Sequence, residues 1–220
     1  METTKYVSPA DVSAISQSQG RVLKNTYLLL AATLFFSAIT ATASAVMNLP
    51  HPGLLLTLGG YFGLLYLTTR FRDSIKGLYC VFALTGFMGY TLGPIIGAYW
   101  AMAPAIVMQS LGGTAFIFLG LSAYALTGRT DFSFLGKTLF VGILVAFCAG
   151  IGALVFNIPA LSLAVSAMFM LLMSGLILYQ TDQIVRGGET NYIMATVTLF
   201  VSLFNLLTSM MHLLGFAQSE

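Results

Sequence analysis

Seven apolar runs, each about the length of a transmembrane helix, follow one another along the chain. An α-helix needs about 20 predominantly apolar residues to cross a hydrocarbon core of roughly 30 Å. The composition agrees, because 58% of the residues are hydrophobic and 7% are charged, whereas a soluble domain is roughly a quarter charged. The sequence therefore predicts an all-α membrane protein with helices near residues 26–47, 53–69, 77–98, 104–127, 135–156, 159–180 and 193–215.

The predicted helices form a single transmembrane domain, residues 26–216, between two polar ends. Residues 1–25 are low in bulky side chains, so we expect a flexible N-terminal tail, and residues 217–220 form a short C-terminal tail. The first run, followed by Ala41–Ala45, has features of a signal peptide with a cleavage site. Because a long polar segment precedes it and six runs follow, we expect an uncleaved first helix.

All nine lysines and arginines fall on one side of this topology. They lie in the N-terminal tail and after the second, fourth and sixth runs, and none lies in the other loops or the C-terminal tail. The positive-inside rule then predicts a cytoplasmic N-terminus and an outward-facing C-terminus. No acid or cation is predicted near mid-membrane, where proton and cation pathways usually carry one. The cations are Lys5, Arg21, Lys24, Arg70, Arg72, Lys76, Arg129, Lys137 and Arg186.

The third run contains glycines at a helical spacing. Gly89, Gly93 and Gly97 recur every four residues and share one face, which lets another helix approach closely. Pro94 removes a backbone donor and is expected to kink the helix. Tight helix packing explains this pattern, and the alternative is a broken helix that lines a pore.

A polar stripe follows one face of the seventh run. Its spacing of three and four residues is that of a helix face, and lipid does not tolerate such a face. We expect this helix to lie inside a bundle, with its polar side chains either bonded to other helices or lining a water-filled cavity. The stripe consists of Thr198, Ser202, Asn205, Ser209 and His212.

The sequence contains no convincing catalytic or metal-binding pattern. A dyad of Ser174 and His212 fails, because the two residues are predicted at different membrane depths. No second His or Cys stands at metal-ligand spacing from His212, and paired intramembrane aspartates, HExxH and phosphate-binding glycine loops are absent. We therefore expect a non-enzymatic protein of the lipid bilayer, with no cofactor and no nucleic-acid partner.

The last loop, VRGGETNYI (Val185–Ile193), concentrates polar residues between two apolar runs. Gly187 and Gly188 are typical of a helix stop, and either Thr190 or Asn191 can cap the next helix. The segment is therefore interpreted as a tight reversal between the sixth and seventh helices.

Several of these segments together resemble the Bax-inhibitor family of multi-pass membrane proteins. The similar motifs are GFMGYTLGPIIG, TDFSFLGK (Thr130–Lys137), LYQTDQI (Leu178–Ile184) and ETNYIMATVTLFVSLFNLL. The first run, with NTYLLL and FSAITATAS, is further similar to the bacterial YccA-like subgroup. The resemblance implies six helices around a central seventh, and a place in the bacterial inner membrane with a periplasmic C-terminus.

The resemblance also implies two candidate activities. Some family members are pH-sensitive calcium leak channels, in which an acid ending the sixth helix and one within the seventh share protons. An arginine of the second helix gates the pore with them. The YccA-like subgroup is instead associated with the membrane-bound ATP-dependent protease FtsH, as a partner that restrains its action on membrane substrates.

This chain departs from the channel pattern at both acidic positions. Gln180 and Ser202 stand where the family has acids, and neither carries a negative charge near neutral pH. Asp182 is a poor substitute, because it points about 200° away around the helix and is expected at the water boundary. Arg70 or Arg72 occupies the position of the gating arginine without a matching acid.

The sequence therefore favours a non-enzymatic inner-membrane protein that binds FtsH and modulates it negatively. The alternative is a calcium or proton leak pathway with an uncharged lining of Thr198, Ser202, Asn205 and His212.

Overall fold

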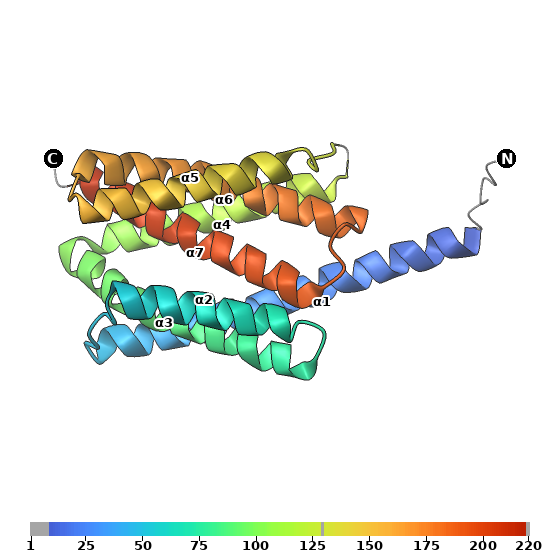
Figure 1. Cartoon of the computed structure of the whole chain (residues 1–220), viewed down its shortest axis with the longest axis horizontal. Coiled ribbons are helices and arrows are strands. Elements are labelled where there is room, and N and C mark those ends of the chain that lie inside the picture. The colour runs from blue at the N-terminus through green and yellow to red at the C-terminus, as the bar shows by residue number, and fades with distance from the viewer. Residues whose placement is uncertain (1–8, 129, 219–220) are drawn as a thin grey trace.

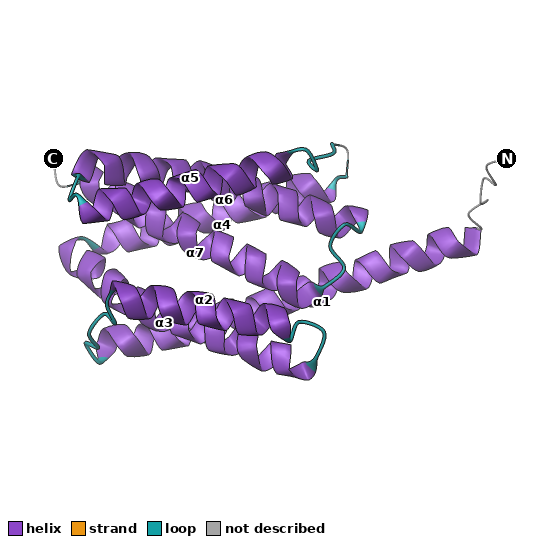
Figure 2. Cartoon of the chain, in the orientation of Figure 1, coloured by secondary structure: helices purple, strands orange, loops and turns teal. Residues whose placement is uncertain are grey.

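The computed structural model describes residues 9–128 and 130–218, and these residues form seven α-helices and no strand (Figure 2). Six helices are long and apolar enough to cross a membrane, and α2 is shorter, with 17 residues. The expected all-α, multi-pass membrane protein is confirmed. The helices are α1 (Pro9–Val46), α2 (Leu54–Arg70), α3 (Ile75–Met102), α4 (Pro104–Leu126), α5 (Leu135–Val155), α6 (Pro159–Arg186) and α7 (Tyr192–Ala217).

The outer surface of the bundle carries many large apolar side chains. Leu55 is 87% exposed, Phe116 80% and Leu171 72%. Soluble proteins rarely expose large contiguous apolar surfaces, so these side chains are suited to contact with lipid.

The helices form two groups with α7 between them (Figure 1). α3 packs against α1 and α2, α6 packs against α4 and α5, and α7 contacts α1, α3, α4 and α6. α2 and α5 touch through Phe62 and Phe147, whose ring centroids are 6.0 Å apart. The most apolar segment of α7 is 61% buried, against 17 to 50% in the other five candidate spans. α7 is therefore the most buried of these helices.

The first helix differs from its expected boundaries. α1 begins at Pro9, inside the segment expected as a flexible tail, so residue 26 is not a structural boundary. A proline is favourable in the first helical turn, where its missing N–H costs nothing. Val22 and Leu23 also pack against the hydrophobic core. Residues 1–8 lie outside the described residues.

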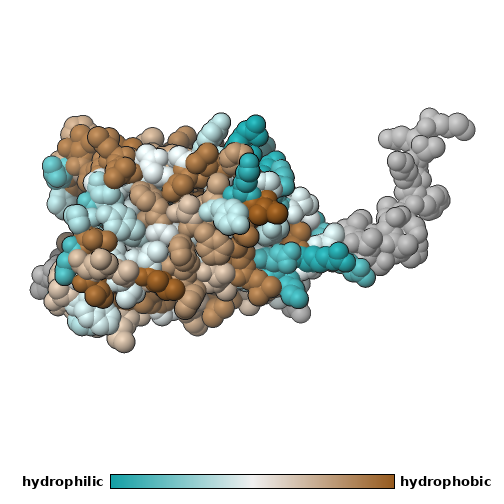
Figure 3. All heavy atoms as spheres, turned by 90° about the horizontal axis from the view of Figure 1, so that it is seen from below, coloured by the Kyte–Doolittle hydropathy of each residue, from teal (hydrophilic) through white to brown (hydrophobic). Residues whose placement is uncertain are grey.

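The polar loops gather at the end of the bundle from which α1 emerges. The α2–α3, α4–α5 and α6–α7 loops all lie there (Figure 1). Figure 3 shows hydrophilic side chains concentrated at this end, with hydrophobic side chains over much of the remaining face. We call it the charged end, and the positive-inside rule predicts that it is cytoplasmic.

Candidate functional site

A fully buried carboxylate lies at the charged end, where α6 approaches the α4–α5 loop. The side chain of Asp182 is 0% exposed. Its Oδ1 accepts a hydrogen bond from Nε of Arg186 at 2.8 Å, and its Oδ2 accepts one from the backbone N–H of Phe132 at 3.0 Å. Asp182 lies near the end of α6, and the α4–α5 loop folds over it and covers its carboxylate.

Arg186 and Gln183 extend this contact along the loop. Nη2 of Arg186 donates to the carbonyl oxygens of Thr130 at 2.7 Å and Gly128 at 3.3 Å. Nε2 of Gln183 donates to Oγ of Ser133 at 3.1 Å. We call Asp182, Gln183 and Arg186, with Gly128 and residues 130–133 of the loop, the loop clamp. It fixes the α4–α5 connection to the end of α6.

The exposed acid of the same loop is held locally. Oδ1 of Asp131 accepts a 2.8 Å hydrogen bond from the backbone N–H of Ser133. This bond, with the Ser133 hydroxyl and the positive charge of Arg186, lowers the pKa of Asp131. Asp131 therefore stays ionised at neutral pH, and its 3.8 Å contact with Nε of Arg186 adds to the clamp.

Gln180 and Ser202, the two positions where the resemblance implies acids, are both buried. Gln180 is 6% exposed, and its Nε2 has no hydrogen-bond partner among the described residues. Ser202 is 0% exposed, and its hydroxyl donates to the carbonyl oxygen of Thr198 at 2.8 Å. Both environments are closed to solvent and neither side chain ionises near neutral pH, so the pair lacks the titration that a di-carboxylate sensor needs.

The two arginines considered for a gate lie on the surface. Arg70 and Arg72 are both exposed. Arg72 is 3.5 Å from its neighbour Asp73, which is itself 79% exposed. Within the described residues, neither arginine forms an ion pair with α6 or α7.

The polar stripe of α7 is bonded mostly within its own helix. Thr198 donates to the carbonyl oxygen of Met194 at 3.0 Å, and Nδ2 of Asn205 donates to that of Val201 at 2.8 Å. Ser209 is buried, 8% exposed. These bonds satisfy polar groups without another helix, which is the common behaviour of Ser and Thr inside helices.

His212 is the member of the stripe that bonds across helices. Its Nδ1 lies 2.7 Å from Oγ of Ser166 on α6. Ser174, considered as a dyad partner, instead donates to the carbonyl oxygen of Met170 at 2.8 Å. Ser166 was missed in the sequence, although it lies in the first half of α6, at the depth expected for a residue near the end of α7.

The glycine face of α3 packs closely on α1 at two of its three positions. A Cβ at Gly93 would lie 2.6 Å from the carbonyl oxygen of Ala41, and one at Gly89 would meet the carbonyl oxygen of Ser37. Gly97 differs from the expectation, since a Cβ there would meet no atom within 4 Å. Gly97 therefore does not mark a close approach of α3 to another helix.

Ser44 compensates for the proline in this interface. Pro94 has no N–H to donate to the carbonyl oxygen of Tyr90, four residues earlier. The hydroxyl of Ser44 on α1 donates to that oxygen at 3.0 Å. The donor lost by Pro94 is therefore replaced from the neighbouring helix.

The reversal between α6 and α7 joins two loops of the charged end. Gly187 ends α6 with a left-handed φ of 78°. Asn191, rather than Thr190, caps α7, because its Oδ1 accepts from the N–H groups of Ile193 and Met194, both at 3.0 Å. Its Nδ2 donates to the carbonyl oxygen of Arg72 at 3.1 Å and to Oδ1 of Asp73 at 2.8 Å. One side chain thus caps a helix and ties the α6–α7 loop to the α2–α3 loop.

The long apolar helices and lipid-suited surface define a multi-pass integral membrane protein. No group of three His, Cys, Asp or Glu that could hold a metal ion occurs in the described part of the chain. A family model described as "Inhibitor of apoptosis-promoting Bax1" matches residues 19–219, and the chain therefore belongs to the Bax-inhibitor family.

Curated relatives match the chain over most of its length. "Modulator of FtsH protease YccA" of Escherichia coli strain K12 is 50% identical over 204 residues, which are 92% of this chain and 93% of the relative. An uncharacterised protein of Pseudomonas aeruginosa is 48% identical over 222 residues, 100% of each chain. An uncharacterised membrane protein of Vibrio cholerae is 40% identical over 198 residues, 89% of each chain.

Proposed function

We propose that this protein is an inner-membrane partner of the FtsH protease, which binds the protease and restrains its action on membrane substrates. The observation that carries the proposal is the similarity to the Escherichia coli modulator of FtsH, 50% identical across 92% of this chain. The shared region includes most of the transmembrane bundle, so a shared partner within the membrane is consistent with it.

The architecture supports a role through contact. The charged end presents the projecting part of α1 beside three loops, and the loop clamp and Asn191 hold those loops in fixed positions. A fixed polar surface suits protein recognition, because less conformational entropy is lost on binding. We place this end in the cytoplasm by the positive-inside rule, and the C-terminus in the periplasm. We also propose that α7 is the central helix of the bundle, with α1, α3, α4 and α6 packed directly against it.

Reconstitution with FtsH tests the proposal. FtsH and this protein would be placed in the same proteoliposomes, with one membrane substrate and one soluble substrate. We expect co-isolation of the two proteins and a degradation rate of the membrane substrate that falls as this protein is added. An unchanged rate, with no co-isolation, would refute the proposal. A variant with the loop clamp broken, Arg186→Met, shows whether the fixed loops matter for binding.

The rival function, a calcium or proton leak, is measured in the same membranes without FtsH. We expect no flux above that of empty liposomes at pH values around neutral, because Gln180 and Ser202 lack the family's titratable pair. Robust flux that is lost on Ser202→Leu would favour the leak instead.

A further inference from the structure

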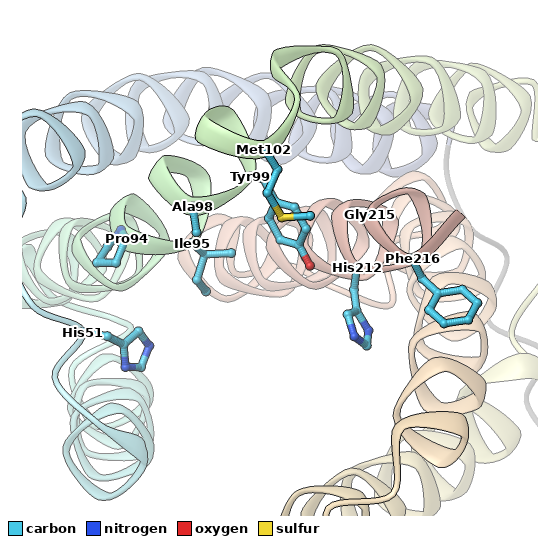
Figure 4. Close-up of a pocket in the computed structure, with 9 residues that line it drawn as sticks. All are labelled: His51, Pro94, Ile95, Ala98, Tyr99, Met102, His212, Gly215 and Phe216. Atoms are coloured by element: carbon cyan, nitrogen blue, oxygen red, sulfur yellow. The ribbon is translucent and has the colours of Figure 1, made fainter. Parts of the chain in front are cut away.

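The chain has two histidines, and both line one pocket at the end of the bundle opposite the charged end (Figure 4). The pocket has a volume of about 520 Å³, within the roughly 300–1,000 Å³ of small-molecule sites. His51 comes from the α1–α2 loop, His212 from α7, and the wall between them from the last turns of α3. Neither the family's acidic positions nor the loop clamp contributes to it.

The walls of the pocket are largely apolar. Ile95 and Met102 of α3 and Phe216 of α7 face it, and no Asp, Glu, Lys or Arg is among the lining residues. Tyr99 adds a hydroxyl group, which points into the same part of the pocket as His212, while His51 lies at the opposite side (Figure 4). The polar groups therefore consist of one phenol and two imidazoles on an apolar surface.

The hydrogen bonds around His212 favour one tautomer of its ring. The hydroxyl of Ser166 donates its single proton to the carbonyl oxygen of Ser162 at 3.0 Å. With the proton of that hydroxyl directed to the carbonyl oxygen of Ser162, we infer that Nδ1 of His212 is the donor in the 2.7 Å contact. A neutral imidazole has one donor and one acceptor nitrogen. Nε2 of His212 is therefore the acceptor nitrogen, and the ring lies in the same part of the pocket as Tyr99 (Figure 4).

His51 has the opposite tautomer. The backbone N–H of Gly53 donates to Nδ1 of His51 at 3.1 Å, so this nitrogen carries no proton. The proton of the neutral ring is then on Nε2. The two sides of the pocket differ in chemistry, and the combination of a free acceptor and a free hydroxyl donor occurs at His212 and Tyr99.

We propose that this pocket binds a single-chain amphiphile with a carboxyl head group, such as a long-chain fatty acid. The carboxyl proton is shared with, or transferred to, Nε2 of His212, and the hydroxyl of Tyr99 donates to the second carboxyl oxygen. The acyl chain lies on the apolar wall of α3. A carboxyl group fits because it presents a proton for the imidazole and an oxygen for the phenol, and the imidazolium–carboxylate pair that results is charge-assisted.

Other ligand classes fit less well. A phosphodiester head group brings no proton for Nε2 of His212, and a metal ion finds no carboxylate in the lining. A fatty alcohol can bond to both groups through one oxygen but forms no ion pair, so it is the informative competitor.

Nitrogen NMR of ¹⁵N-histidine protein tests the proposal directly, since only His51 and His212 give imidazole signals. The protein would be held in nanodiscs of phosphatidylethanolamine and phosphatidylglycerol. Without ligand, we expect opposite tautomers for the two rings. On addition of palmitate, Nε2 of His212 should shift toward the protonated position, while His51 changes less. The same tautomer in both rings, no response to palmitate, or an equal response to hexadecanol would overturn the proposal.

Binding of radiolabelled palmitate provides the second measurement. Loss of a hydrogen bond to a charged group weakens binding by about tenfold or more, so we expect this effect for His212→Ala and for Tyr99→Phe. Tyr99→Phe removes one oxygen and keeps the ring, so a loss of binding in this variant is not explained by misfolding. Thr42→Val, in the neighbouring crevice between α1 and α3, is the matched control and should bind palmitate as the wild type does. Equal affinity in all three variants would overturn the proposal.

Discussion

The carboxylate of Asp182 and the guanidinium of Arg186, one helical turn apart in α6, form a 2.8 Å ion pair whose two halves have different environments. The carboxylate is 0% exposed, whereas the arginine side chain is 34% exposed. The arginine also donates to two carbonyl oxygens of the α4–α5 loop. The two side chains should therefore differ in what their removal costs.

Arg186→Met should destabilise the protein more than Asp182→Asn. Without Arg186, the buried carboxylate keeps only the N–H of Phe132, and we expect a loss of roughly 2–3 kcal/mol in the free energy of unfolding. In Asp182→Asn no buried charge remains, so the loss should be smaller. The double variant should lose less unfolding free energy than the sum of the two single losses, because the two sites are coupled. Denaturant unfolding in mixed micelles measures all three.

Arg72→Met is the matched control for this cycle. Its ion pair with Asp73 is 3.5 Å long and exposed on both sides. Exposed pairs contribute about 0–1 kcal/mol, so the unfolding free energy should stay close to that of the wild type. If Arg72→Met lowers the unfolding free energy as much as Arg186→Met does, the effect of Arg186→Met does not depend on the buried carboxylate.

Alanine at Gly93 and at Gly97 should have different effects on stability. At Gly93 the new Cβ would lie 2.5 Å from Cβ of Ser44 and 2.6 Å from the carbonyl oxygen of Ala41, so α1 and α3 must separate. We expect a loss of about 1–3 kcal/mol. At Gly97 the space is open, and alanine favours helix by up to about 1 kcal/mol. Thermal unfolding of the two variants measures the difference, and equal midpoints would contradict it.

The sequence predicted the helices well because membrane crossing requires long apolar runs. Such runs are recognised from the residue types alone, without knowledge of tertiary contacts. The sixth helix nevertheless continues six residues beyond its expected end at residue 180, to Arg186, and only this extension places Asp182 and Arg186 one helical turn apart. The burial of Asp182 was not predictable in the same way. It depends on the α4–α5 loop, where Phe132 lies 50 positions away in the sequence. Phe132 contributes only its backbone N–H, which every residue except proline has, so its residue type gives no signal of the contact.

The polar face of α7 illustrates the same limit. Its spacing predicted a face shielded from lipid, but not where each side chain bonds. Thr198 and Asn205 bond within α7, and His212 bonds to Ser166. The pocket at His51 and His212 was also missed, because its residues come from three separate segments and no local spacing connects them.

Asn191 variants should separate helix capping from loop attachment. Asn191→Ala removes both, and the loss of a helix cap alone costs about 1 kcal/mol. Asn191→Asp keeps an oxygen for the N–H groups of Ile193 and Met194 but loses the donor to Arg72 and places a second carboxylate beside Asp73.

Hydrogen exchange distinguishes the two effects. In Asn191→Ala, the first amides of α7 and the α2–α3 loop should both exchange faster. In Asn191→Asp, only the α2–α3 loop should do so. Faster exchange at Ile193 and Met194 in Asn191→Asp would show that the two roles are not separable.

The polar N-terminal segment is of the length and kind by which an energy-dependent protease engages a chain, and we take FtsH as the candidate. Deletion of Met1–Gly20 should then abolish degradation of this protein. The deletion leaves Arg21 and Lys24 to hold the topology, and Val22 and Leu23 in contact with the core. The truncated protein should therefore still fold and insert, while an energy-dependent protease loses the length of chain it needs. Pulse-chase measurement of the protein's half-life, in cells with and without FtsH, checks this.

A Gly/Ser-rich segment of equal length, which behaves as a flexible coil, should restore degradation if length alone matters. If the truncated chain turns over as fast as the intact one, engagement occurs elsewhere.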